Sequence, residues 1–349
     1  MAELSLDGVG KRFGEHAAVS GLTLDVAPGE FVALLGPSGC GKTTVLRMLA
    51  GFEHPSEGRI RLGDRTLSDA TCHVPPEERH MGMVFQSYAL WPHMNVADNV
   101  GYPLKLRGVG GRDYRRRVDE ALAMVQLAAL AEHRPQELSG GQRQRVALAR
   151  CLVASPSVVL LDEPLANLDR HLRATMEEGF RTFHRRSGAT LVYVTHDQGE
   201  AMALADRIAV MREGRLVQWS TPETLYRQPR SEWLAGFIGQ GSVLMLPGAA
   251  PGQWLQGEAL MSAAGEAGPQ GRGPVLIRPE HVRLGERGMR ARVERAIFRG
   301  ERYELGLRLA DGSALLAHSS RRLVEGGVVG VTLELGWGLE PEAGTTGRD

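Results

Sequence analysis

The first two thirds of the chain alternate between two hydrophobic patterns. Short, nearly continuous apolar runs that end in glycine or polar residues predict central parallel strands covered on both faces. These runs occupy residues 31–36, 158–163 and 190–196. Helical segments are predicted between and after them, at about 42–51, 94–155, 169–187 and 198–205. Such alternation predicts an α/β fold that binds ligands at the carboxyl ends of its strands.

Shorter alternating stretches predict further strands around this core. Residues 4–35 are typical of strands joined by a tight turn, and residues 58–67 of an exposed hairpin. One short strand is expected at 82–86, and an edge hairpin at 206–220.

The composition changes near residues 236–252, and short strands separated by glycine follow. Their spacing predicts a small β-barrel-like domain. We therefore predict an α/β domain over residues 1–235, with a helical subdomain at about 89–155, and an all-β domain over 236–349. The last ten residues, EPEAGTTGRD, are expected to form a disordered tail.

Composition limits the classes of function. Of 349 residues, Lys and Arg total 41 and Asp and Glu also total 41, so no net charge favours nucleic acid as a partner. The three cysteines fit free thiols in a reducing cytosol better than a disulfide framework. The N-terminal segment lacks the apolar core of a signal peptide, and the longest apolar runs are too short to cross a bilayer. We expect a soluble chain that meets a membrane only through partners.

A glycine-rich loop supplies the first candidate site. Its sequence, GPSGCGKTT, matches the phosphate-binding pattern G-x-x-x-x-G-K-[ST] between a predicted strand and a predicted helix. The glycines let the backbone wrap a β-phosphate, Lys42 would reach the β and γ oxygens, and the Thr43 hydroxyl would ligate Mg²⁺. The predicted nucleotide-binding residues are Gly36, Pro37, Ser38, Gly39, Cys40, Gly41, Lys42, Thr43 and Thr44.

Polar residues at the ends of the predicted strands supply candidate catalytic groups. Asp162 ends one apolar run, where a carboxylate can hold Mg²⁺ or its water, and Glu163 could activate the attacking water. His196 ends another run and could reach the γ-phosphate as a neutral donor, although a single histidine is more often structural. Gln86 closes the strand at 82–86, where its amide oxygen could complete the Mg²⁺ or water shell.

A second phosphate-binding candidate begins at residue 138. The segment LSGGQRQRVALAR joins a turn of small residues to an Arg-rich helix. Glycines at a helix start leave backbone N–H groups uncovered, and such groups bind phosphate. The sequence thus predicts two phosphate-binding elements.

In order and approximate spacing, GPSGCGKT, Gln86, LSGGQ, LLDEP, NLD and His196 resemble the motifs of the ATP-binding cassette (ABC) ATPases over about residues 1–235. The resemblance implies a P-loop NTPase with a RecA-like core and a helical subdomain, which hydrolyses ATP with Mg²⁺. It assigns catalysis to Glu163 and His196. Other matched positions are Phe13 for adenine stacking, Thr43, Gln86 and Asp162 for Mg²⁺, Ser139, Gly140, Gly141 and Gln142 for the signature loop, and Asp169 for the loop that joins two protomers.

The resemblance also implies a set of partners. In a homodimer, the signature loop of one copy would press on the γ-phosphate bound to the other. The chain would dock on two integral membrane permease subunits at the cytoplasmic face of the inner membrane, as a peripheral protein, and serve a periplasmic or extracellular solute-binding protein indirectly. Residues 85–100, FQSYALWPHMNVADNV, could seat a permease helix or pack inside their own lobe.

The C-terminal region narrows the class. VLIRPEHVRL and the segment ARVERAIFRGERYELGLRLADG resemble the OB-like, TOBE-type β-domain appended to ATPases of binding-protein-dependent importers. QSYALWPHM and the overall size resemble most the ferric-iron, polyamine and aminophosphonate members, with sulfate, molybdate or sugar uptake as alternatives.

Two other classes fit less well. A repair or translation ATPase would carry coiled coils, zinc modules or tandem cassettes, and an exporter subunit is usually fused to membrane spans or lacks this β-domain. The sequence leaves open whether the β-domain senses a regulator or only supports the dimer.

Overall fold

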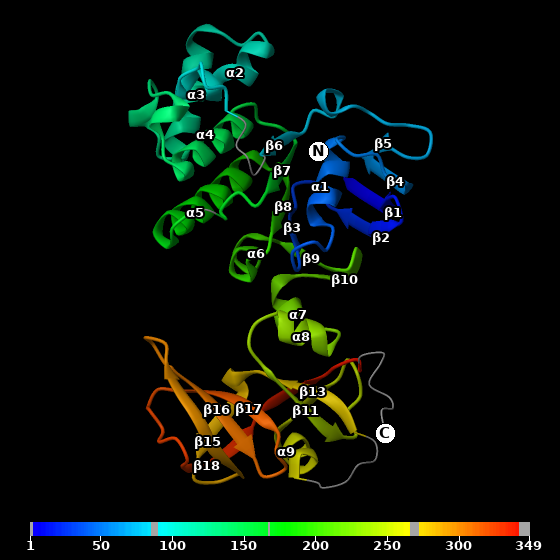
Figure 1. The fold of residues 1–349 in the computed structure, drawn as a ribbon, viewed down its shortest axis with the longest axis vertical. Coiled ribbons are helices and arrows are strands. Elements are labelled where there is room, and N and C mark those ends of the chain that lie inside the picture. The colour runs from blue at the N-terminus through cyan, green and yellow to red at the C-terminus, as the bar shows by residue number, and fades with distance from the viewer. Residues whose placement is uncertain (1–2, 85–89, 167, 266–271, 342–349) are drawn as a thin grey trace. The chain divides into compact units, whose positions relative to one another are not determined.

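The computed structural model describes residues 3–84, 90–166, 168–265 and 272–341 (Figure 1). Contacts divide the chain into two units, Met1–Pro222 and Glu223–Asp349. No helix in the described ranges combines the length and the apolar character that crossing a bilayer requires. Gln86 and most of the tail predicted after residue 339 lie outside the described residues.

A six-stranded sheet forms the centre of the first unit, in the order β10-β9-β3-β8-β7-β6. All neighbouring strands pair in parallel except β10, which runs antiparallel to β9 at one edge. Strands β3, β7 and β8 are buried along their whole length, as their apolar runs predict. Their carboxyl ends therefore meet at one edge of the sheet. The strands are β3 Phe31–Leu35, β6 Gly82–Val84, β7 Val158–Asp162, β8 Thr190–Thr195, β9 Arg207–Arg212 and β10 Arg215–Ser220.

Helix α1 (Lys42–Ala50) is packed between this sheet and a second, antiparallel one. One hydrophobic cluster joins Leu46 of α1 to Leu6 in the antiparallel sheet and Val192 in the central sheet. Burial of α1 on two sides fixes the glycine-rich loop at its N-terminus. The second sheet has the order β2-β1-β4-β5 and contains β1 Leu4–Phe13, β2 His16–Val26, β4 Glu57–Leu62 and β5 Arg65–Ser68.

Two features close the C-terminal end of α1. Gly51 takes a left-handed conformation with φ 88°, which glycine adopts without steric cost. Arg79 is only 2% exposed, and its guanidinium donates hydrogen bonds to carbonyl groups of the last helical turn. The acceptors are the carbonyl oxygens of Met48, Leu49, Leu67 and Val74 and the hydroxyl of Ser68, at 2.7–3.3 Å.

Three helices form the predicted helical subdomain, grouped away from α1 in Figure 1: α2 Val96–Leu106, α3 Gly111–Met124 and α4 Gly140–Leu152. The ring centroid of Trp91 lies 4.4 Å from that of Tyr102, and the Arg150 guanidinium lies 4.7 Å from the Trp91 ring. Trp91 thus packs inside its own lobe, which is one of the two alternatives for residues 85–100. Helices α5 (Arg170–Ser187) and α6 (Gln198–Leu204) follow β7 and β8 in the chain.

The second unit contains two antiparallel sheets, in the orders β11-β13-β19-β12 and β14-β18-β15-β16-β17. Leu244, Val275, Val293, Leu307 and Val331 belong to its hydrophobic core. The strands are β11 Ser242–Pro247, β12 Trp254–Gln256, β13 Arg272–Ile277, β14 Val282–Gly285, β15 Met289–Phe298, β16 Tyr303–Leu309, β17 Ala314–Ser319, β18 Val328–Leu333 and β19 Leu335–Gly338.

Three helices of this region are absent from the sequence prediction: α7 Pro222–Arg227, α8 Glu232–Phe237 and α9 Gly257–Gly265. The contact boundary follows Pro222, whereas composition places it after residue 235. Buried Arg278 explains the difference, because it donates hydrogen bonds to the carbonyl oxygens of Tyr226 (2.6 Å) and Gln240 (2.8 Å). These bonds tie the segment after Pro222 to the β-domain.

Candidate functional site

The glycine-rich loop lies between β3 and α1, as predicted. Gly41 precedes the first helical residue with φ 102°, and a Cβ atom there would lie 2.4 Å from the carbonyl oxygen of Ala18. Only glycine fits this close approach. No side chain caps this helix start, so the first N–H groups of α1 remain available to an anion.

Lys42 brings a positive charge into this loop. Its ammonium is buried and donates hydrogen bonds to the carbonyl oxygens of Gly36 (2.7 Å) and Pro37 (2.9 Å). The Cys40 thiol lies 3.8 Å from the same ammonium. These partners are backbone carbonyls and not a carboxylate, so they do not neutralise the charge of Lys42. The charge therefore remains available to attract a negatively charged ligand.

Thr43 and Asp162 meet where α1 begins and β7 ends. The Thr43 hydroxyl donates to the Asp162 carboxylate across 3.3 Å. Burial raises the pKa of the Asp162 carboxyl, the hydrogen bond from Thr43 opposes this, and the nearby charge of Glu163 raises it further. Two oxygen ligands of the kind that Mg²⁺ prefers are thus adjacent, and a bound cation would stabilise the buried charge.

Glu163 and His196 lie at the ends of adjacent strands and contact each other. The distance between Glu163 Oε1 and His196 Nδ1 is 3.2 Å. Glu163 has a left-handed backbone with φ 46°, and its N–H donates to the carbonyl oxygen of Val194 on β8. Such a conformation is strained for a non-glycine residue and is often found at functional sites.

The signature segment begins helix α4. Ser139 is the N-cap: its hydroxyl accepts from the N–H of Gln142, whose side-chain oxygen accepts from the N–H of Ser139. Gly140 and Gly141 form the first helical turn. Among the described residues, no hydrogen bond joins this segment to the glycine-rich loop of the same chain.

Three predicted site residues remain: Phe13, Asp169 and Gln86. The Phe13 side chain is 47% exposed, and the Lys11 ammonium lies 4.9 Å from its ring centroid. Asp169 is the N-cap of α5 and accepts from the N–H groups of His171 and Leu172, which lowers the pKa of its carboxyl. Gln86 lies outside the described residues, so its place in the site stays a prediction.

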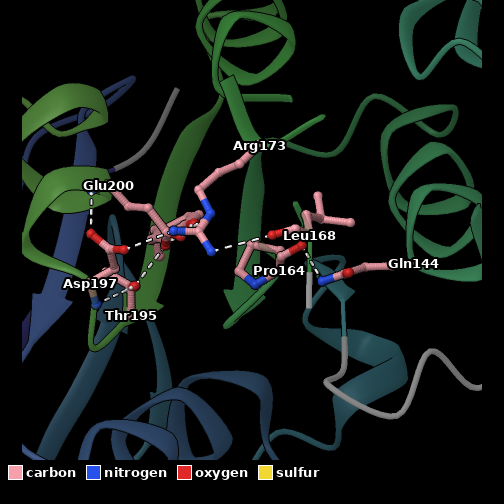
Figure 2. A network of polar contacts seen from close by, with 8 residues as sticks. Gln144, Pro164, Leu168, Arg173, Thr195, Asp197 and Glu200 are labelled. Carbon is pink, nitrogen blue, oxygen red and sulfur yellow. Dashed lines mark hydrogen bonds and ion pairs between the residues drawn. The ribbon is translucent and has the colours of Figure 1, made fainter. Parts of the chain in front are cut away.

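A polar network next to His196 was not predicted from the sequence (Figure 2). Arg173 on α5 contacts Asp197 and Glu200, and the Gln144 side chain donates to the carbonyl oxygen of Pro164. The D-x-x-E spacing of Asp197 and Glu200 is a helix-start signal in the sequence, and Asp197 does cap α6. Nothing local in the sequence marks Arg173 or Gln144.

Comparison with known proteins identifies the class. The ABC transporter family matches residues 19–166, and the TOBE domain family matches residues 275–340. The spermidine/putrescine import ATP-binding protein PotA of Rubrobacter xylanophilus is 45% identical over 329 residues, which cover 90% of this chain and 85% of that protein. The chain therefore belongs to the ATP-binding subunits of ABC importers, and the expected fold class and ATPase activity are confirmed.

Two further proteins are similar to about two thirds of the chain. The trehalose/maltose import ATP-binding protein MalK of Thermococcus litoralis is 52% identical over 241 residues, covering 68% of this chain and 65% of that protein. Among solved structures, the ATP-binding cassette MJ0796, in a dimeric post-hydrolysis state with ADP and Pi, matches with a TM-score of 0.57 and 31% identity. That match covers 63% of this chain and 98% of the other.

Proposed function

We propose that this importer subunit binds the triphosphate of ATP on Gly36–Thr44 and hydrolyses it with Glu163 and His196. The observation that carries the proposal is the 3.2 Å contact between Glu163 and His196 at the carboxyl ends of β7 and β8. The Thr43–Asp162 pair lies at the same edge of the sheet. The exposed ring of Phe13 offers a surface on which adenine stacks. The Lys42 ammonium and the open N–H groups of α1 attract the phosphates.

Mg²⁺ fits this site as a partner of ATP. The described residues contain no cluster of three or more His, Cys, Asp or Glu side chains that could hold a metal alone. Mg²⁺ commonly takes one or two protein oxygens and completes its shell with phosphates and water. Thr43 and Asp162 would hold it, and Gln86 is the third expected ligand. When bound, the ion supplies neutralisation of phosphate charge.

The chain's own groups would then carry the chemistry. The Glu163 carboxylate orients the attacking water and accepts its proton. His196 contacts that carboxylate through Nδ1. A neutral imidazole carries one N–H, so the ring donates either to Glu163 or, once it turns towards the nucleotide, to the γ-phosphate. Its side chain is 58% exposed, so substrate and partner can reach it.

We further propose that two copies complete each site. The dimeric state of the similar MJ0796 cassette supports this. Ser139, Gly140, Gly141 and Gln142 of one copy would close on ATP held by the other, with Asp169 at the junction.

The pair would work on two permease subunits at the cytoplasmic face of the membrane, with an external solute-binding protein as an indirect partner. We propose a polyamine as the imported solute. The relative named for spermidine and putrescine matches nine tenths of the chain, including the β-domain, whereas the one named for trehalose and maltose matches about two thirds.

The catalytic assignment is tested with Glu163→Gln. This variant keeps the size of the side chain and removes the base, so ATP binding persists while turnover falls by about a hundredfold or more. Turnover is measured as phosphate release, with Glu178→Gln, an exposed glutamate of α5, as the matched control. Near-normal turnover of Glu163→Gln would refute the assignment.

The solute assignment is tested in cells. A strain that lacks this chain should lose uptake of labelled spermidine or putrescine and recover it when the chain is restored. Loss of sugar or ferric-iron uptake, with polyamine uptake intact, would contradict the assignment.

A further inference from the structure

Arg173 lies in the first turn of α5 and contacts two loops of the site at once. One guanidinium nitrogen, Nη1, donates to Asp197 Oδ2 at 3.0 Å, and Nη2 donates to the carbonyl oxygen of Leu168 at 3.4 Å. Nε lies 3.6 Å from Glu200 Oε1. Leu168 directly precedes Asp169, and Asp197 directly follows His196. Figure 2 shows Arg173 between these two segments.

Glu200 extends this contact into the end of β8. It is 4% exposed, and its Oε2 accepts hydrogen bonds from the hydroxyls of Thr195 (2.7 Å) and Tyr193 (2.8 Å). Asp197 also binds this segment, since its N–H donates to the Thr195 hydroxyl and its Oδ1 accepts from the N–H of Glu200. Both residues that flank His196 are therefore fixed by groups that Arg173 contacts.

A buried carboxylate such as Glu200 is costly unless a cation and hydrogen-bond donors compensate it. Arg173 provides the cation, and its planar fork reaches the second carboxylate and the loop carbonyl in the same geometry. A lysine ammonium is a single point charge and cannot reach both hydrogen-bond acceptors and the Glu200 carboxylate in this way. The arrangement thus selects arginine.

We propose that Arg173 is a positioning residue that makes the loop of Asp169 and the loop of His196 take their catalytic arrangement together. It acts through Asp197 and Glu200, which hold His196 against Glu163, and through Leu168, which leads into the dimer junction. The inference rests on the proposed roles of His196 and Asp169.

The test compares Arg173→Met with Arg185→Met, a matched change at an exposed arginine on the same helix. Misplacing a catalytic group costs about tenfold to a hundredfold in rate, so kcat of Arg173→Met falls by that factor while KM for ATP and nucleotide binding stay unchanged. Arg173→Lys keeps the charge without the fork and has an intermediate kcat. A kcat within twofold of the Arg185→Met value, or a loss of ATP binding as large as the loss of kcat, would overturn the inference.

A second variant separates positioning from a general loss of structure. Asp197→Asn keeps the N-cap of α6, because asparagine is also a good cap, and removes the charge that faces Arg173. Its kcat falls similarly, and the double variant falls no further than the worse single one, since both break one link. Multiplying effects would contradict the link. Failure of the proposed catalytic site is recognised separately, by unchanged turnover of Glu163→Gln.

Discussion

Replacing Arg79 by methionine tests how the helix that carries the glycine-rich loop is anchored. Methionine fills part of the buried volume but leaves four carbonyl oxygens and the Ser68 hydroxyl without their donor. An unsatisfied buried polar group costs about 1–3 kcal/mol, although some of these carbonyls keep a second partner within the helix or sheet. Met48 O, Leu67 O and the Ser68 hydroxyl keep a second partner in Gly51, Val74 and His73. At about 2 kcal/mol for each of the other two groups and about 1 kcal/mol for each of these three, the gross loss is about 6–8 kcal/mol.

An opposing contribution comes from the charge itself. Burial lowers the pKa of the Arg79 guanidinium to about 10, well below its ordinary value. At about 1.4 kcal/mol per pH unit, holding the charge inside costs about 3 kcal/mol, and the substitution removes this cost. The net expectation is a loss of about 3–5 kcal/mol in the free energy of unfolding, similar to other broken buried charge networks.

The measurement is calorimetric unfolding of the full chain with and without ATP. The transition that ATP shifts upward belongs to the unit that contains the glycine-rich loop. Arg79→Met should lower this transition by about 10 °C, from about 2–4 °C per kcal/mol for a unit of this size. Arg59→Met, at a 54% exposed side chain paired with Asp69 just after β5, should move it by less than about 2 °C. A loss below about 1 kcal/mol for Arg79→Met would refute the reasoning.

Further predictions concern the site itself. Asp162→Asn should raise the stability of the nucleotide-free chain at pH 7, because burial raises the pKa of Asp162 and the charged carboxylate is therefore disfavoured in the folded state. As the pH falls towards the ordinary carboxyl pKa of about 4, the folded wild type takes up a proton before the unfolded chain does. The difference in the free energy of unfolding between Asp162→Asn and the wild type therefore shrinks. A difference that stays constant with pH would contradict this. The same variant should lose at least about a hundredfold in Mg²⁺-dependent turnover, measured by phosphate release. Gly41→Ala should weaken ATP binding strongly in a nucleotide titration, since its Cβ would lie 2.4 Å from the Ala18 carbonyl oxygen. The Cβ of Gly39→Ala meets nothing within 4 Å, so this variant should cost only the strain of its φ of 79°, about 1–2 kcal/mol.

The sequence predicts well the parts of the fold that local pattern determines. Strands β3, β7 and β8 are continuous apolar runs, and the loop before Lys42 combines glycines with a strand before it and a helix after it. Because parallel strands end at one edge, the meeting of Asp162, Glu163 and the loop follows from topology alone. The Glu163–His196 contact confirms that these two strand ends are adjacent.

Features that depend on distant partners were not predicted. Arg79 and Arg173 look like ordinary surface residues in the sequence, and only tertiary structure shows that one is buried and the other bridges two loops. The link between the segment after Pro222 and the β-domain is a further example, since it depends on a hydrogen bond from Arg278. Composition cannot reveal such a bond across tens of residues.

The left-handed backbone of Glu163 has a consequence for protein engineering. A glycine or asparagine tolerates φ 46° better than glutamate does, so the folded chain gains stability when the carboxylate is lost. Selection of random variants for heat resistance alone would therefore favour chains that lack the proposed catalytic carboxylate. A screen for heat-resistant transporters therefore needs growth on the imported solute as a second requirement.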